Sequence, residues 1–335
     1  DPLPSASGPA SRPAASSDSG GSPPAAGESH YTQRSLSLSQ ELMMHWTPLL
    51  ALLLALPVLA SPTLFTYMSP ESEHDPRSTY DRELLRLALE KTRASHGDYR
   101  MQAAPPMTLA RMWVSLRFND YPNLFAMDSY RSDRDMSGID YVRFPIHLGI
   151  VSYRICFVSP EQQSAVAGVT SLAELKRFDI GQGKGWLDVQ ILQRAGFKVQ
   201  EVEGYEQLFK MVARGRFALF CRGINELPQE KLNHSDVPGL VMDENVALYY
   251  PLPRVFFTHN SNQQTIIRVQ QGLKAAWRDG SLQALWLKTF KPSLSFAHLH
   301  TRRLFRLENP YIEGIDFNYQ AYFYDPVQGR FGPGE

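Results

Sequence analysis

Short apolar strands alternate with amphipathic helices in the middle of the chain, and this pattern constrains the fold more than any other feature. Residues 153–158 (YRICFV) and 217–221 (FALFC) are apolar runs of the length and composition of buried strands. Two further strands are predicted between them, each followed by a helical pattern, at 186–195 and 205–214. Repeated β-α-β units with short connections predict an α/β fold with a mostly parallel sheet.

The alternation continues on both sides of this centre. A helix is expected over 108–118, where Leu109, Met112, Trp113 and Leu116 share one face. Beyond the centre, two helices are predicted at 263–278 and 281–290, and from Leu299 we expect extended segments. The other expected strands lie at 62–68, 124–127, 246–250 and 254–258.

Composition supports a folded chain with no general affinity for nucleic acid. Hydrophobic residues make up 43 % of the 335, which is enough for a substantial core. The 34 Lys and Arg balance the 34 Asp and Glu, so no basic face for DNA or RNA is expected. The two cysteines, Cys156 and Cys221, lie on strands that could be neighbours, so both a disulfide and two buried thiols remain open.

The first sixty residues are not expected to belong to the fold. Residues 1–42 are rich in Ser, Ala, Pro and Gly, and the first methionines are Met43 and Met44. An apolar run over 46–59, followed by Ala60-Ser61, resembles a secretory signal peptide spanning 43–60. Residues 1–42 are then disordered, or lie upstream of the true start. The alternative is a disordered tail before a signal anchor.

Two places could carry chemistry at the ends of strands. The turn 181–186 (GQGKGW) follows a strand and opens a helix, so its backbone N–H groups and Lys184 could bind an anion, or it could be a plain glycine turn. Arg222 follows a buried strand at the edge where open sheets place ligands. It could bind a carboxylate or phosphate, or be clamped by Glu226 or another acid.

Other charged residues give weaker signals. Arg134, Arg143 and Arg154 surround the point where the chain leaves one group of strands for the next, although each could also be a solvated surface residue. His298 and His300 have no acidic neighbour in sequence, and a zinc site needs at least three protein ligands, so no metal site is predicted.

The order of these elements, from about residue 64 to 290, resembles the type II periplasmic solute-binding proteins, in particular the family 3 class linked to amino-acid ABC transporters. Residues 144–154 (FPIHLGIVSYR) resemble the segment that crosses from the first lobe to the second. Residues 171–183 resemble the family's "dLkGk-vgv-GT" region, and 205–218 resemble its "GR-DA" helix and strand. Residues 273–290 resemble the closing helices.

The resemblance implies two lobes, each a mostly parallel sheet flanked by helices, joined by two hinge crossovers. Lobe 1 would comprise residues 61–152 and 252–335, and lobe 2 residues 153–251. The ligand would bind non-covalently between the lobes and close the hinge.

Two departures from the family bear on the ligand. Lys184 stands where amino-acid-binding members usually carry Thr, and Arg222 stands where an acid usually holds the ligand ammonium. The expected ligand is therefore anionic or carboxylate-bearing, and no cofactor is expected. The candidate ligand-binding residues are Tyr67, Glu71, Arg134, Arg154, Lys184, Gly185, Trp186, Arg222, Gly223 and Asn225.

Three functions remain open on these grounds. The first is an exported, monomeric periplasmic protein that delivers a small molecule to an ABC transporter. The second is a periplasmic sensor of the same fold that signals to a membrane receptor. The third is an enzyme on this fold, such as a dehydratase, with Glu226 or Glu71 as the catalytic group.

Overall fold

The computed structural model describes residues 61–69 and 77–335. All of these belong to one compact unit, 60–335. The predicted upstream segment, the predicted signal peptide and the candidate residue Glu71 lie outside the described residues. In the part of the chain that the structure describes, no helix is long and apolar enough to cross a membrane.

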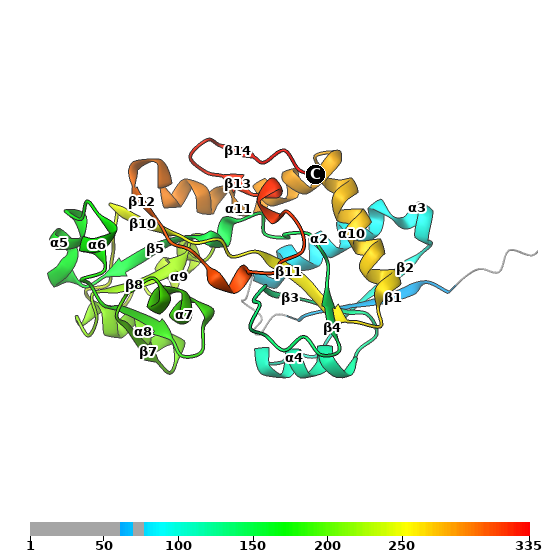
Figure 1. Ribbon diagram of the computed structural model, residues 1–335, viewed down its shortest axis with the longest axis horizontal. Coiled ribbons are helices and arrows are strands. Elements are labelled where there is room, and N and C mark those ends of the chain that lie inside the picture. Colours follow the sequence, from blue (N-terminus) through cyan, green and yellow to red (C-terminus); the bar gives the residue numbers. More distant parts are fainter. Residues whose placement is uncertain (1–60, 70–76) are drawn as a thin grey trace, which may run out of the picture. The chain divides into compact units, whose positions relative to one another are not determined.

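The first sheet has five strands in the order β2-β1-β3-β11-β4 (Figure 1). β1 pairs in parallel with β2 and with β3, whereas β11 pairs antiparallel with both β3 and β4. The strand that completes this sheet therefore comes from far along the chain. The bounds are β1 (Thr63–Tyr67), β2 (Tyr99–Ala103), β3 (Leu124–Ser129), β4 (Ile139–Tyr141) and β11 (Arg254–His259).

Helices cover both faces of this sheet. Side chains alternate along β3 and β11, so Phe125 and Phe256 join the main core while Ala126 and Phe257 join a second, smaller core. Helix α4 (Leu109–Phe118), predicted over 108–118, packs on the second core, and the side chain of Thr108 caps it. Helices α2 (Arg77–Lys91) and α10 (Gln263–Arg278) pack against each other on the main core. The short helix α3 (Arg93–His96) follows α2.

The second sheet has seven strands. Six follow the order β12-β10-β5-β8-β6-β7, and β9 pairs with the end of β5. Every residue of β5 is buried, because helices and loops cover both faces as its continuous apolar run predicts. The bounds are β5 (Tyr153–Val158), β6 (Ile180–Gly183), β7 (Val199–Val202), β8 (Leu219–Gly223), β9 (Val241–Met242), β10 (Val246–Tyr249) and β12 (Arg303–Arg306).

The helices of this region are short. Helix α7 starts next to Trp186, and α8 packs Leu208, Phe209 and Val212 inward at the predicted helical spacing. Ser171 caps α6 by accepting a hydrogen bond from the Glu174 amide, as its capping-box sequence indicates. The bounds are α5 (Gln163–Ala167), α6 (Leu172–Leu175), α7 (Leu187–Arg194), α8 (Tyr205–Ala213) and α9 (Leu227–Asn233).

The predicted α/β class, with sheets flanked by helices, is confirmed, but the sheets are mixed rather than mostly parallel. Parallel pairing holds within β2-β1-β3 and β7-β6-β8. The strands next to the crossovers, β5, β10 and β11, pair antiparallel with strands of their sheets. The reason is geometric. The first crossover leads into β5 and the second crossover leads out of β10, so these two neighbouring strands run in opposite directions.

Cys156 and Cys221 form a disulfide. The two residues lie directly opposite each other on the antiparallel pair β5–β8, and both are 1 % exposed. The bond therefore ties together two central strands of the second sheet, and of the two alternatives left open by the sequence the structure contains the disulfide.

Two crossovers connect the sheets, at 142–152 between β4 and β5 and at 250–253 between β10 and β11. Helix α11 (Ser281–Ala297) runs on past residue 290, where the sequence pattern ends it, and includes Pro292. The strand β12 that follows lies within 252–335, the segment assigned to lobe 1, yet it pairs in parallel with β10 of the second sheet.

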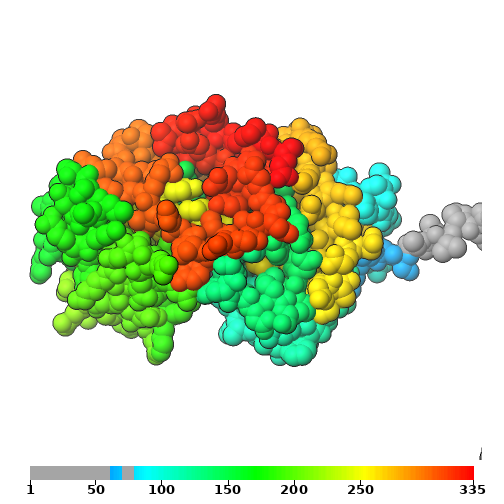
Figure 2. Space-filling view, in the orientation of Figure 1, coloured from blue at the N-terminus to red at the C-terminus, as the bar shows by residue number. Residues whose placement is uncertain are grey.

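Residues 307–323, which we call the strap, return from β12 to the first sheet. The amide of Asn309 donates to the Pro251 carbonyl at the second crossover, and Ser132 N–H donates to the Tyr311 carbonyl. The carboxylate of Asp316 binds Tyr141 and Arg143. The strap thus contacts both crossovers and β4, and the orange-to-red end of the chain runs over the centre of the molecule in Figure 2. The hairpin β13 (Tyr324–Asp325) and β14 (Arg330–Phe331) ends the chain.

Candidate functional site

The structure brings several predicted residues of the second sheet together where strands β5 and β8 meet. Arg154 on β5 pairs in register with Gly223 on β8. A Cβ atom on Gly223 would lie 2.5 Å from Arg154 Nη1 and 2.6 Å from Asn225 Oδ1. Only glycine therefore leaves room for the Arg154 guanidinium to lie beside Asn225.

Arg154 is held by two partners that sequence reasoning missed. Its Nε donates to the Tyr250 hydroxyl at 3.0 Å, and its Nη2 lies 3.1 Å from Asp188 Oδ1. The Tyr250 hydroxyl in turn donates to Asp188. Tyr250 belongs to the second crossover and Asp188 to the first turn of α7, so this cluster joins the hinge to the site.

Burial and charge act against each other on these groups. Burial alone would raise the pKa of Asp188, but Arg154, the Tyr250 hydroxyl and Arg222 outweigh it, so the pKa lies below its usual value. Burial likewise opposes the charge of Arg154, yet Asp188 and Tyr250 keep the Arg154 pKa above its usual value. Burial raises the pKa of Tyr250. Arg154 and Asp188 are therefore an ion pair at neutral pH.

We expect Asp188→Asn to lower the free energy of unfolding by about 3 kcal/mol at pH 7, because it leaves Arg154 buried without its counter-ion. The Asp188 pKa is lower in the folded state, so its contribution is complete above the unfolded value of about 4 and is lost as the pH falls further. Urea unfolding from pH 7 to pH ~2.5 should show the variant and wild type converging in acid. Asp98→Asn, at an exposed ion pair, is the control. If the difference in unfolding free energy between wild type and Asp188→Asn stayed constant over this pH range, Asp188 would not be the ionised partner of Arg154.

Arg222 is clamped by two carboxylates, which is the second of the two readings that its sequence left open. Its Nη2 lies 2.8 Å from Glu226 Oε2, and its Nε donates to Glu230 Oε1 at 2.7 Å. The Tyr205 hydroxyl donates to the same Glu230 oxygen, and the guanidinium stacks 4.7 Å from the Trp186 ring. Burial raises the pKa of Glu230 against the opposing effect of Arg222.

Two buried acceptors in this region have no hydrogen-bond donor among the described residues. They are Asn225 Oδ1 and Glu230 Oε2. A buried acceptor without a donor costs free energy, so each is a place where a bound molecule could supply an N–H or O–H group. The two arginines of this side, Arg154 and Arg222, face the three carboxylates of Asp188, Glu226 and Glu230. The second-sheet side is consequently not the basic surface that the arginines suggest in the sequence.

The glycine turn after β6 shapes the site, but the ammonium group of its lysine, Lys184, is bound by an acidic side chain of this chain. A Cβ on Gly183 would lie 2.3 Å from the Trp186 ring, so glycine allows Trp186 to fold back over the strand end. Lys184 is exposed and pairs with Glu203 at 2.5 Å. The Gly185 amide, at φ 78°, donates to Glu201. The donors expected to meet an anion are thus engaged by acidic side chains, and a ligand role for Lys184 and Gly185 stays a prediction.

Arg134 is the predicted site residue on the first-sheet side. It lies on the loop after β3, with its guanidinium 3.8 Å from the centre of the Trp113 ring and Nη2 3.3 Å from Asp128 Oδ2. Trp113 also donates to Asp128. Partial burial lowers the pKa of Arg134 in spite of Asp128. Tyr67 ends β1 of the same sheet and is half-buried.

A hydrogen bond joins the two sides. Arg131 Nη2 donates to Gln190 Oε1 at 2.9 Å. Arg131 stands three residues before Arg134, and Gln190 stands two residues after Asp188 on α7. The bond therefore brings the loop of Arg134 opposite the helix that carries Asp188. In Figure 2 a notch separates the teal residues of the first side from the yellow-green residues of the second.

Metal binding finds no support in the described residues. No group of three or more His, Cys, Asp or Glu side chains lies close enough together there to hold an ion. His298 and His300 lie at the end of α11, with ring centres 6.2 Å apart.

Comparison with known proteins yields matches among solved structures only. No protein-family model matches the chain, and no curated protein matches it. An ancestral arginine-binding protein bound to arginine is 14 % identical, covers 68 % of this chain and 98 % of its own, and superposes with a TM-score of 0.49. A structure from work on glutathione import via GshT and the cystine ABC importer TcyBC of Streptococcus mutans is 14 % identical over 69 % of this chain and 95 % of its own (TM-score 0.48). The GluR0 ligand-binding core of Nostoc punctiforme with L-glutamate is 15 % identical over 69 % of this chain and all of its own (TM-score 0.45).

Proposed function

We propose that this chain is an exported periplasmic solute-binding protein that captures a small carboxylate-bearing metabolite between its two lobes and delivers it unchanged to an ABC transporter. The observation that supports the proposal is the Arg131–Gln190 hydrogen bond, which brings the loop that carries Arg134 against α7, the helix that carries Asp188. A molecule held between these sides contacts both sheets, so it favours the closed arrangement of the hinge.

Arg134 is the residue proposed to bind the ligand carboxylate. Its guanidinium lies 3.8 Å from the centre of the Trp113 ring, and its Nη2 lies 3.3 Å from Asp128 Oδ2, so two neighbours orient its planar fork of donors. A fixed guanidinium plane suits bidentate binding of a carboxylate. Arg154 and Arg222 each already bind carboxylates of this chain and are less suited to that role.

The other end of the ligand is proposed to carry a hydrogen-bond donor, such as an amine or a hydroxyl. Within residues 61–69 and 77–335, the second-sheet side holds three carboxylates against two arginines, and Asn225 Oδ1 and Glu230 Oε2 lack donors. A second carboxylate placed there would meet excess negative charge. The two sides together therefore favour a molecule that is acidic at one end and a donor at the other.

The buried disulfide supports an oxidising compartment for the proposed function. Disulfides persist in secreted and periplasmic proteins and are rare where thiols are kept reduced.

The proposal is tested by identifying the bound molecule. Protein purified without unfolding is denatured, and the released small molecules are analysed by mass spectrometry. The result expected is a carboxylate-bearing metabolite that rebinds on isothermal titration calorimetry and is recovered unchanged. Recovery of a chemically altered molecule after incubation would instead establish an enzyme.

We expect Arg134→Ala to weaken binding of the recovered metabolite by about 2–4 kcal/mol, because the buried carboxylate loses its charged partner. Arg134→Lys should restore only part of the affinity, since an ammonium cannot bind both carboxylate oxygens in one plane. Arg93→Ala, at an exposed ion pair with Asp98, is the matched control and should bind normally. Unchanged affinity in a folded Arg134→Ala variant would remove Arg134 from the site.

A further inference from the structure

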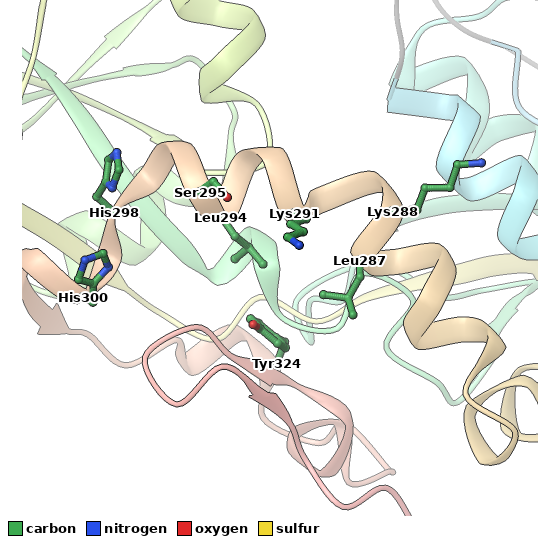
Figure 3. Close-up of a pocket in the computed structure, with 8 residues that line it drawn as sticks. All are labelled: Leu287, Lys288, Lys291, Leu294, Ser295, His298, His300 and Tyr324. Carbon is green, nitrogen blue, oxygen red and sulfur yellow. The ribbon is translucent and has the colours of Figure 1, made fainter.

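A groove of about 650 Å³ lies between helix α11 and the hairpin β13–β14, and none of its lining residues belongs to the site described above. Figure 3 shows the eight side chains around it. They are Leu287, Lys288, Lys291, Leu294, Ser295, His298, His300 and Tyr324.

The floor of the groove is apolar and firmly held. Leu287, Lys291 and Leu294 are spaced four and three residues apart, so they share one face of α11. Tyr324 lies opposite them, and its ring packs 4.9 Å from both Trp286 and Phe331. Its backbone N–H donates to the Leu148 carbonyl in the first crossover region. The groove is therefore a fixed feature of the fold and not a gap beside a loose hairpin.

The rim of the groove is basic. Lys288, Lys291, His298 and His300 are all exposed, no acidic residue lines the groove, and none of the four takes part in an ion pair within residues 61–69 and 77–335. Elsewhere in the same residues Lys91, Lys184 and Lys274 each bind a carboxylate. Lys291 projects from α11 between Leu294 and Leu287, on the side of the helix that faces Tyr324, whereas Lys288 points away from the groove (Figure 3).

We infer that this groove docks an acidic segment of a partner protein that inserts leucine-like side chains between Leu287, Leu294 and Tyr324. Charge complementarity carries the choice of partner: Lys291, which pairs with no carboxylate in the described residues, faces an apolar floor, and an acidic amphipathic segment supplies both kinds of contact. Five of the eight lining residues are exposed, so the groove is an open trough that suits an extended chain, whereas small-molecule sites enclose most of their ligand.

The test measures binding of a fluorescein-labelled peptide of repeated Leu-Glu-Glu units by fluorescence anisotropy. We expect saturable binding that weakens as salt rises. Lys291→Glu should weaken it by about tenfold or more, since it places like charges in contact. Lys210→Glu, at an exposed lysine of α8 outside the groove, changes net charge equally and should leave binding unaffected.

Four outcomes would overturn the inference. They are no binding at low salt, equal binding of a Ser-Glu-Glu peptide that lacks the apolar anchors, an equal loss in both lysine variants, and binding of dodecanoate in the groove without binding of the peptide. Sedimentation velocity tests whether the occupant is instead a second copy of this chain. Self-association that Lys291→Glu abolishes would show this and would overturn the inference of a partner protein. Thermal unfolding of both variants shows that the fold is retained.

Discussion

Arg222→Met is expected to lower the free energy of unfolding by about 3–5 kcal/mol at pH 7, one of the two largest effects we predict. The guanidinium lies between Glu226 and Glu230, and all three side chains are at most 13 % exposed. Removing it leaves two buried carboxylates close together without the guanidinium that lies between them. Chemical denaturation monitored by tryptophan fluorescence measures the loss, and Arg216→Met, at an exposed arginine, is the control.

Two further measurements separate this mechanism from a simple loss of packing. Glu230→Gln in the Arg222→Met background should restore part of the stability, because it removes one of the repelling charges. Lowering the pH should also reduce the difference in unfolding free energy between Arg222→Met and wild type. Burial already raises the pKa of Glu230, and its carboxyl group accepts a proton more readily once Arg222 is gone. If neither Glu230→Gln nor a lower pH reduces the loss of unfolding free energy, the main contribution of Arg222 is its packing on Trp186 and not its charge.

Replacing both Cys156 and Cys221 by alanine is expected to cost about 4 kcal/mol of unfolding free energy, from the entropy that the cross-link removes from the unfolded chain. The two residues are 65 apart in sequence, so the bond closes a long loop. Urea unfolding with and without reductant measures the effect. Reduced wild type should fall to the stability of the double variant, which should itself be insensitive to reductant. Wild type that is unaffected by complete reduction would contradict this expectation.

Local patterns made much of the fold predictable. Residues 263–278 form a helix with the predicted bounds, because Ile266, Val269, Leu273 and Trp277 mark one buried face and Gly280 lies just beyond its end. The β5 strand was equally clear from its continuous apolar run. These elements depend on neighbours in sequence, which is the information that periodicity contains.

The errors arise where distant segments decide the structure. The pattern ends a helix at 290 because proline disfavours helix interiors, yet α11 continues past Pro292 with Trp286, Phe290 and Ala297 all buried. Nothing in residues 303–306 indicates that they join the second sheet beside β10. Packing outweighs local preference in the first case and supplies the missing partner in the second.

The candidate site shows the same division. Arg222 and Gly223 were predicted from their place at a strand end and Arg154 from its place where the chain passes between the two groups of strands, and the structure brings them together. Their partners were only partly predicted. Glu226 follows Arg222 closely in sequence, but the Asp188 carboxylate and the Tyr250 hydroxyl reach Arg154 from 34 and 96 residues away. The charge balance of the site, and with it the expected polarity of the ligand, depends on those distant partners.

The strap changes what a hinge between the two sheets can do. Rotation about two crossovers alone is opposed by few contacts, but here a third chain segment is anchored at Pro251, at Ser132 and at the Tyr141–Arg143 pair. Any large rotation of one sheet relative to the other must break these hydrogen bonds or move the strap with it, so we expect a narrow range of interlobe angles in the free protein. Less freedom lost on closing means a smaller entropic penalty for each molecule captured.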